Sequence, residues 1–121
     1  MEVMAAMFLD WKALLQQIMK RGGEIGELSP STRAGYRMLH AAGAETGHLD
    51  HKTRELIALA VAVTTRCDGC IANHTQKAIQ LGTTREEIAE ALGVAVAMNA
   101  GAALAYSGRV MDAYAALSEK K

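Results

Sequence analysis

The chain has 121 residues, and its 13 basic and 13 acidic side chains leave a formal net charge of zero. This length predicts one domain with a modest core. Because no basic stripe with interleaved aromatic residues is present, we expect no nucleic-acid partner. Aromatic residues make up 4% of the chain and there are 11 glycines. This composition predicts helices that pack closely together, and not a core built from large aromatic rings.

All of the expected elements are helices. Apolar residues recur at three- and four-residue spacing over residues 3–19, which predicts an amphipathic first helix that stops at Gly22-Gly23. Ser29 as N-cap and Pro30 at the first helical position open a second helix that reaches Gly47. Its polar content predicts a surface position.

The middle of the chain predicts a helical hairpin. Asp50 can cap a third helix over residues 51–65, in which residues 56–63 are apolar all round and are therefore expected to be buried on every side. A fourth helix starts at residues 67–68 and ends at Gly82. Only about two residues separate these helices, which predicts that they pack as an antiparallel hairpin.

The last third predicts two more helices. Thr84 and Glu87 have capping-box spacing and open a fifth helix through about Ala100, and a sixth covers residues 101–117. The uncharged stretch 91–108 is at the short end of what a membrane span needs, so we interpret it as buried protein and expect no membrane partner. We thus predict an all-α fold, with about six helices forming a single domain over the whole chain.

Two cysteines carry the chemistry of this chain. Cys67 and Cys70 are three residues apart, so one helical turn places their Cα atoms about 5 Å apart, within the range for a disulfide. The pair can therefore cycle between dithiol and disulfide. His74 lies one turn beyond Cys70 on the same helical face and can act on its sulfur as a base.

A glutamate completes the constellation. Glu55 lies twelve residues before Cys67, on the other helix of the hairpin. Measured along the helices from the turn, Glu55 and His74 are at similar distances, so the Glu55 side chain can reach His74. This spacing predicts a relay of carboxylate, imidazole and thiol. From the residues alone either sulfur can be the activated one, because Cys67 lies at a helix N-terminus and Cys70 lies beside His74.

Several other interpretations of these residues compete with a redox site. A zinc site would use Cys67, Cys70, His74 and Glu55, but its sulfur and imidazole ligands crowd one short helix. A thioredoxin-like oxidoreductase would require a strand before the motif, and a non-enzymatic helical assembly protein would leave the cysteines without a role.

Other features of the sequence indicate the cellular compartment and the histidines that lie outside the proposed redox site. The start of the sequence lacks the basic region of a signal peptide, and both cysteines belong to one motif, so we expect a reducing cytoplasm. His40, His48 and His51 are interpreted as surface or capping residues. We expect neither a cofactor nor a metal.

The spacing of Glu55, Cys67, Cys70 and His74 resembles the signature of the alkylhydroperoxidase D core, within the carboxymuconolactone decarboxylase-like family. The resemblance covers residues 49–108, including the helix opening at residues 84–92. It implies a thiol-dependent peroxidase that acts on small hydroperoxides. Cys70 would attack the peroxide, Cys67 would resolve the resulting sulfenic acid, and a thiol reductant, in some members a lipoylated protein, would reopen the disulfide.

The resemblance has further implications. Alkylhydroperoxidase D has a histidine between its two cysteines where this chain has Gly69. The decarboxylase branch of the family does not depend on a Cys-x-x-Cys pair, so the two cysteines favour the peroxidase. Small members form homo-oligomers, commonly hexamers built as trimers of dimers. The apolar, small-residue stretch 91–105, together with the wide apolar face of the first helix, independently favours an extensive interface between subunits.

Overall fold

The computed structural model describes residues 6–119, which contain five helices and no strand. The helices are α1 (Trp11–Leu28), α2 (Pro30–Thr46), α3 (His51–Thr65), α4 (Asp68–Gln80) and α5 (Arg85–Leu117). The predicted all-α class is confirmed, with five helices in place of about six.

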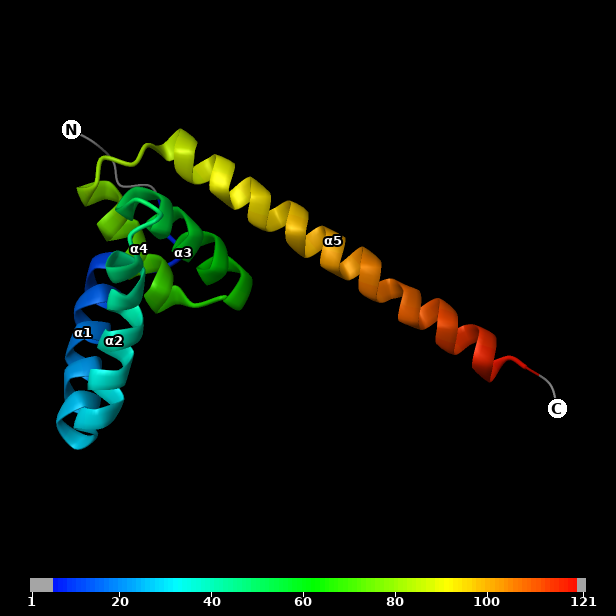
Figure 1. Ribbon diagram of the computed structural model, residues 1–121, viewed down its shortest axis with the longest axis horizontal. Coiled ribbons are helices and arrows are strands. Elements are labelled where there is room, and N and C mark those ends of the chain that lie inside the picture. The colour runs from blue at the N-terminus through cyan, green and yellow to red at the C-terminus, as the bar shows by residue number, and fades with distance from the viewer. Residues whose placement is uncertain (1–5, 120–121) are drawn as a thin grey trace.

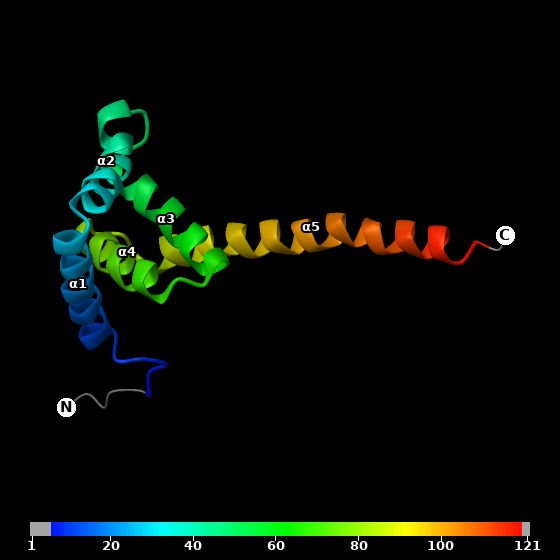
Figure 2. The same cartoon turned by 90° about the horizontal axis from the view of Figure 1, so that it is seen from below.

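Two helical hairpins and one long helix make up the molecule. Helices α1 and α2 lie side by side, and α1 also contacts α4 (Figure 1). Helices α3 and α4 pack together, and α5 packs on α3 before it extends away from the other four helices (Figure 2). The few buried apolar residues come from α3, α4 and α5; they are Leu59, Ala62, Ala72, Ala78 and Ala95.

The turns follow the chemistry that the sequence predicts. Asp50 caps α3 by accepting a hydrogen bond from the backbone N–H of Thr53 at 2.7 Å. Helix α2 begins at Pro30 and is followed by Gly47, whose φ of 71° is in the left-handed region that suits glycine. Arg66, which ends α3, adopts a φ of 54° and turns the chain into α4.

The predicted limits of the first helix are wrong. Residues 3–5 of the expected helix lie outside the described residues, and α1 begins only after its N-cap Asp10. It then runs through Gly22-Gly23 to Leu28. An ion pair of 2.9 Å between Arg21 and Glu24 spans the two glycines, and the next turn packs against α2, so tertiary contact outweighs the low helix propensity of glycine.

The division of the last third into two helices is also wrong. Helix α5 continues for 33 residues through Gly101 and Gly108, and no proline follows either glycine. The polar residues beside them, Asn99 and Ser107, do not act as caps, because their side chains donate to the carbonyl oxygens of Ala95 and Ala103 one turn back in the helix. The capping box at its start is confirmed, since Thr84 Oγ1 accepts from the N–H of Glu87 and the Glu87 carboxylate accepts from the N–H of Thr84.

Burial differs from the expectation in both apolar segments. Within residues 56–63, Leu59 and Ala62 are buried, but Ile57 and Val61 are about half exposed. Helix α5 has only Ala95 buried. By length and composition α5 could cross a membrane, with a mean hydropathy of 1.6 over its most apolar window. The single chain thus leaves a large apolar surface uncovered.

Candidate functional site

The two cysteines lie where α3 gives way to α4. Cys67 is the N-cap of α4, and its Sγ accepts a hydrogen bond of 3.1 Å from the backbone N–H of Cys70. The structure joins Cys67 and Cys70 in a disulfide with their Cα atoms 5.2 Å apart, as one helical turn predicts. Because free N–H groups at a helix N-terminus stabilise negative charge, the same position favours the thiolate of Cys67 when the pair is reduced.

Glu55 and His74 form a buried pair across the hairpin. The Nδ1 atom of His74 lies 2.7 Å from Oε2 of Glu55, and the two residues are only 9% and 4% exposed. This is the contact that the sequence spacing predicts. A carboxylate on Nδ1 holds the imidazole in one orientation and makes its other nitrogen, Nε2, the one available for proton transfer.

The same carboxylate has a second imidazole neighbour. His51, one helical turn before Glu55 on α3, places its Nε2 3.7 Å from Oε1 of Glu55. His40 of α2 lies beside His74, with ring centroids 5.4 Å apart and an angle of 4° between the ring planes. Partial burial, followed by the charges of Lys77 and His74, lowers the pKa of His40, while Glu55 acts in the opposite direction.

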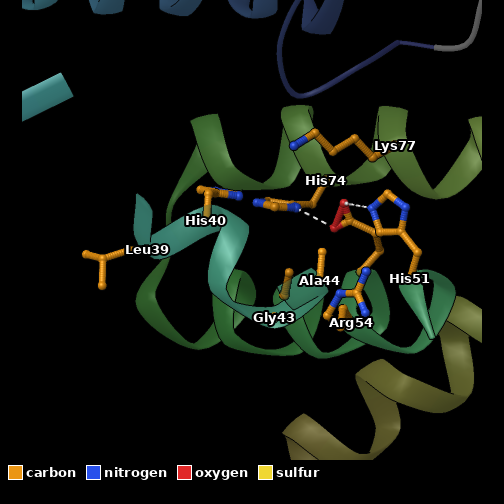
Figure 3. Close-up of a pocket in the computed structure, with 10 residues that line it drawn as sticks. Leu39, His40, Gly43, Ala44, His51, Arg54, His74 and Lys77 are labelled. Carbon is orange, nitrogen blue, oxygen red and sulfur yellow. Dashed lines mark hydrogen bonds and ion pairs between the residues drawn. The ribbon is translucent and has the colours of Figure 1, made fainter. Parts of the chain in front are cut away.

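A cavity of about 550 Å³ opens on this pair. Figure 3 shows His40 and His74 seen edge-on, with Lys77 on the α4 side and Arg54 on the α3 side of the dashed contacts. The lining is completed by small and apolar residues of α2 and α3, namely Leu39, Gly43, Ala44 and Ala58. Neither cysteine belongs to this lining, so the cavity gives direct access to the imidazole and carboxylate.

The expected contact between His74 and sulfur is not made directly. Within residues 6–119 no hydrogen bond joins the His74 ring to Cys70, which remains one helical turn away on the same helix. The structure therefore joins Glu55 to His74 and Cys67 to Cys70, and leaves a turn of α4 between the two pairs.

Three of the residues around the pair are not predicted by the sequence. His40 and His51 are exposed, as the sequence predicts, but they also border the pair. His51 precedes Glu55 by the four residues that bring side chains together on a helix. Lys77 follows His74 by three residues on α4 and is detectable in the same way. His40 carries no such signal, because its place depends on how α2 packs against the hairpin.

The donor set that would suit zinc is not assembled. In the described part of the chain, no three side chains of the histidine, cysteine, aspartate or glutamate type are grouped to hold a metal ion. The four residues considered for zinc are divided into a disulfide and a hydrogen-bonded pair.

A comparison with known families identifies the family of the chain. A model of the carboxymuconolactone decarboxylase family matches residues 30–117, from the start of α2 to the end of α5. The chain belongs to the carboxymuconolactone decarboxylase family. This membership confirms the resemblance seen in the sequence.

Two bacterial relatives match this chain over nearly its whole length. An uncharacterized protein of Haemophilus influenzae is 50% identical over 108 residues, covering 89% of this chain and 96% of the relative. An uncharacterized protein of Cupriavidus necator is 31% identical over 112 residues, covering 93% and 99%. The match therefore extends to α1, beyond the part covered by the family model.

Two solved structures share the fold. A crystal structure of an apo carboxymuconolactone decarboxylase family protein from Legionella pneumophila has a TM-score of 0.70 at 36% identity, covering 90% of this chain and 97% of that one. A protein from Methanobacterium thermoautotrophicum has a TM-score of 0.68 at 29% identity, covering 74% and 98%.

Proposed function

We propose that this member of the carboxymuconolactone decarboxylase family is a thiol-dependent peroxidase that reduces small hydroperoxides. The observation that carries the proposal is one hairpin that holds both a disulfide-forming pair, Cys67 and Cys70, and a buried carboxylate–imidazole pair, Glu55 and His74. A dithiol supplies two electrons, and an oriented imidazole supplies a proton to the leaving oxygen.

In the first step the Cys70 thiolate attacks the terminal oxygen of the hydroperoxide. The O–O bond breaks, the sulfur becomes a sulfenic acid, and the alkoxide leaves as an alcohol after it takes a proton. His74 gives that proton from Nε2, directly or through water, while Glu55 stabilises the charged imidazolium from the other side.

In the second step the Cys67 thiolate attacks the sulfenic acid. The S–O bond breaks, the disulfide forms and water leaves with one proton taken up. At the N-cap position the Sγ of Cys67 faces the backbone N–H of Cys70, a setting that stabilises negative charge on sulfur and suits the resolving role. The sum is one hydroperoxide and two thiols converted into one alcohol, one water and one disulfide.

A separate dithiol then reduces the disulfide and returns the protein to its starting state. A lipoylated protein is the reductant that we propose, with the reaction taking place in the cytoplasm. The protein itself supplies no further thiol, because the sequence has only these two cysteines.

The test is to mix the reduced protein with cumene or tert-butyl hydroperoxide and to count free thiols over time. Both thiols are expected to disappear together in the wild type. Cys67→Ser is expected to leave a sulfenic acid on Cys70 that dimedone traps, and Cys70→Ser to stop the reaction. Dimedone labelling of Cys67 in the Cys70→Ser protein at the wild-type rate would reverse the two roles.

One observation favours a second candidate, proton transfer on a lactone as in the decarboxylase branch. The cavity is lined by Glu55 and His74 and by neither cysteine. A Cys67→Ser/Cys70→Ser double variant separates the candidates, since proton transfer to a lactone would survive it and hydroperoxide reduction would not.

A further inference from the structure

The charge of the cavity beside His74 is unbalanced. Its lining contains two permanent cations, Arg54 and Lys77, and three histidines, against a single carboxylate, Glu55. The chain as a whole has equal numbers of basic and acidic side chains. The cavity therefore has a local excess of positive charge on a chain that is neutral overall.

Neither cation is neutralised by the protein. Glu55 already has an imidazole on each oxygen, from His74 and His51. No ion pair with a carboxylate involves Arg54 or Lys77 in the part of the chain that the structure describes. Unpaired cations are common on this protein, since among the described lysines and arginines only Lys52, with Glu87, and Arg21, with Glu24, form ion pairs. What distinguishes the cavity is that two unpaired cations line it together with a single carboxylate.

The position of Arg54 is fixed by contacts other than an ion pair. Its guanidinium donates a hydrogen bond to the carbonyl oxygen of Leu49. Its side chain also lies against Gly43, where a Cβ atom would come within 2.7 Å of Arg54 Cδ. The Arg54 guanidinium is therefore already in position before an anion binds. Together with Lys77 and the apolar walls of the cavity, it produces a positive potential that attracts the anion.

A neighbouring cavity extends the same positive surface. It has a volume of about 370 Å³, shares His40 and Lys77 with the first cavity, and adds Arg37 from α2. The combined opening is large enough for an organic molecule of several carbons in addition to its charged end.

We propose that this cavity, with Arg54 and Lys77 in its walls, binds the carboxylate of an acidic hydroperoxide, so that organic acids bearing a hydroperoxide are the preferred substrates. The proposal rests on the peroxidase function proposed above. Lys77 follows Cys70 by seven residues on α4, a rise of about 10.5 Å along the helix. The carboxylate and the hydroperoxide of a good substrate are therefore separated by roughly that distance, with the molecule lying along α4 past His74.

The first arm of the test compares the 9-hydroperoxide of linoleic acid with its methyl ester, which has the same hydroperoxide and no charge. We expect kcat/KM of the wild type to be about tenfold higher for the acid, the size of effect given by one charged contact of modest strength. In Lys77→Gln and in Arg54→Gln the acid-to-ester ratio is expected to fall toward one. Lys20→Gln, which removes a cation of α1 outside the cavity lining, is the matched control and retains the ratio.

The second arm does not depend on catalysis. Calorimetry measures binding of the corresponding hydroxy acid, which carries the carboxylate but cannot react, to the wild type and to Lys77→Gln. Lys77-dependent binding supports the anion site even if no hydroperoxide is reduced, and in that case only the peroxidase function is lost. Equal rates for acid and ester together with no hydroxy-acid binding would overturn the anion site and leave the peroxidase standing. Displacement of the hydroxy acid by equimolar inorganic phosphate would overturn the assignment to carboxylates.

Discussion

At the scale of single residues, Gly69 shows how packing limits the site. A Cβ atom at this position would lie 2.9 Å from Cδ1 of Ile18, because α1 crosses close to the start of α4. A side chain at this position, such as the histidine that alkylhydroperoxidase D carries between its cysteines, therefore requires the Ile18 side chain to shift. In this chain an imidazole from α2, that of His40, stacks on His74.

This contact gives a stability prediction. Gly69→His is expected to lower the free energy of unfolding by about 1–3 kcal/mol, the usual cost of overpacking. Adding Ile18→Ala to that variant should recover part of the loss, whereas Ile18→Ala alone should only destabilise. Urea unfolding of the three variants measures this, and a Gly69→His protein as stable as the wild type would show that α1 adapts without cost.

The Glu55–His74 pair gives a kinetic prediction. Glu55→Gln and His74→Gln are each expected to slow hydroperoxide-dependent thiol loss by about 100-fold, the usual contribution of a positioned acid or base. The double variant should be little slower than either single one, since both changes remove the same unit. His51→Gln is the matched control, because its imidazole lies farther from the carboxylate, at 3.7 Å against 2.7 Å. Multiplied effects in the double variant would show that the two residues act separately.

His40 gives a prediction about pH. Partial burial, Lys77 and His74 lower the pKa of His40 in the folded protein, and Glu55 only partly offsets them. The unfolded chain, with a histidine pKa near 6.5, then binds this proton more readily. The free energy of unfolding should therefore decline as the pH falls below about 6.5, because protonation of this residue favours the unfolded state.

His40→Gln should make that decline shallower in urea titrations between pH 7 and pH 5. His48→Gln, in the loop between α2 and α3, is the control and should leave the slope unchanged. A steeper decline in His40→Gln would mean that the charged form of His40 stabilises the folded protein, which is the opposite of what a lowered pKa predicts.

At the scale of elements, the start of α5 depends on its capping box. Thr84→Ala removes the hydroxyl that accepts from the N–H of Glu87 and should cost about 1 kcal/mol of stability. Thr84→Ser keeps the acceptor and should remain close to the wild type. Urea unfolding at one fixed protein concentration measures the free energy of unfolding of both variants. Equal losses in the two variants would indicate that the methyl group of Thr84 stabilises the protein and that the hydroxyl cap does not.

The helices also show what the sequence can and cannot specify. Caps and left-handed glycines act within a few residues, so Asp50, Pro30 and Gly47 fix the ends of α2 and α3 from sequence alone. The spacing of Glu55 and His74 is sufficient to predict their contact, because a two-residue turn fixes the register of the hairpin. The continuation of α1 through Gly22-Gly23 depends on packing against α2 and could not be predicted from local signals.

At the scale of the whole molecule, the apolar surface of α5 is left uncovered by the single chain. Its second half extends away from the other helices (Figure 2) and contacts nothing that would stabilise it. The large apolar residues exposed along α5 are Val94, Val96, Met98, Leu104, Tyr106, Val110, Met111, Tyr114 and Leu117. Ile57 and Val61 of α3 add to this surface. We propose that further copies of the chain cover it, in a homo-hexamer built as a trimer of dimers.

Light scattering tests this assembly. We expect a mass close to six times 12.9 kDa, and a smaller species with less helical circular dichroism for a Leu104→Glu/Val110→Glu variant. Lys20→Gln, on the exposed side of α1, should keep the wild-type mass. A stable monomer at micromolar concentration, or recovery of the protein in the membrane fraction, would contradict a surface made for other copies.

The central claim is that the dithiol reduces hydroperoxides, and the most direct measurement is the balance of products after one equivalent of cumene hydroperoxide is added to the reduced protein. Mass spectrometry of the protein and chromatography of the alcohol report both sides of the reaction. We predict equal amounts of cumyl alcohol and of the Cys67–Cys70 disulfide, formed at the same rate in the wild type and about 100-fold more slowly in Glu55→Gln. Unchanged hydroperoxide with both thiols still reduced, or alcohol formed as fast by the Cys67→Ser/Cys70→Ser protein, would contradict it.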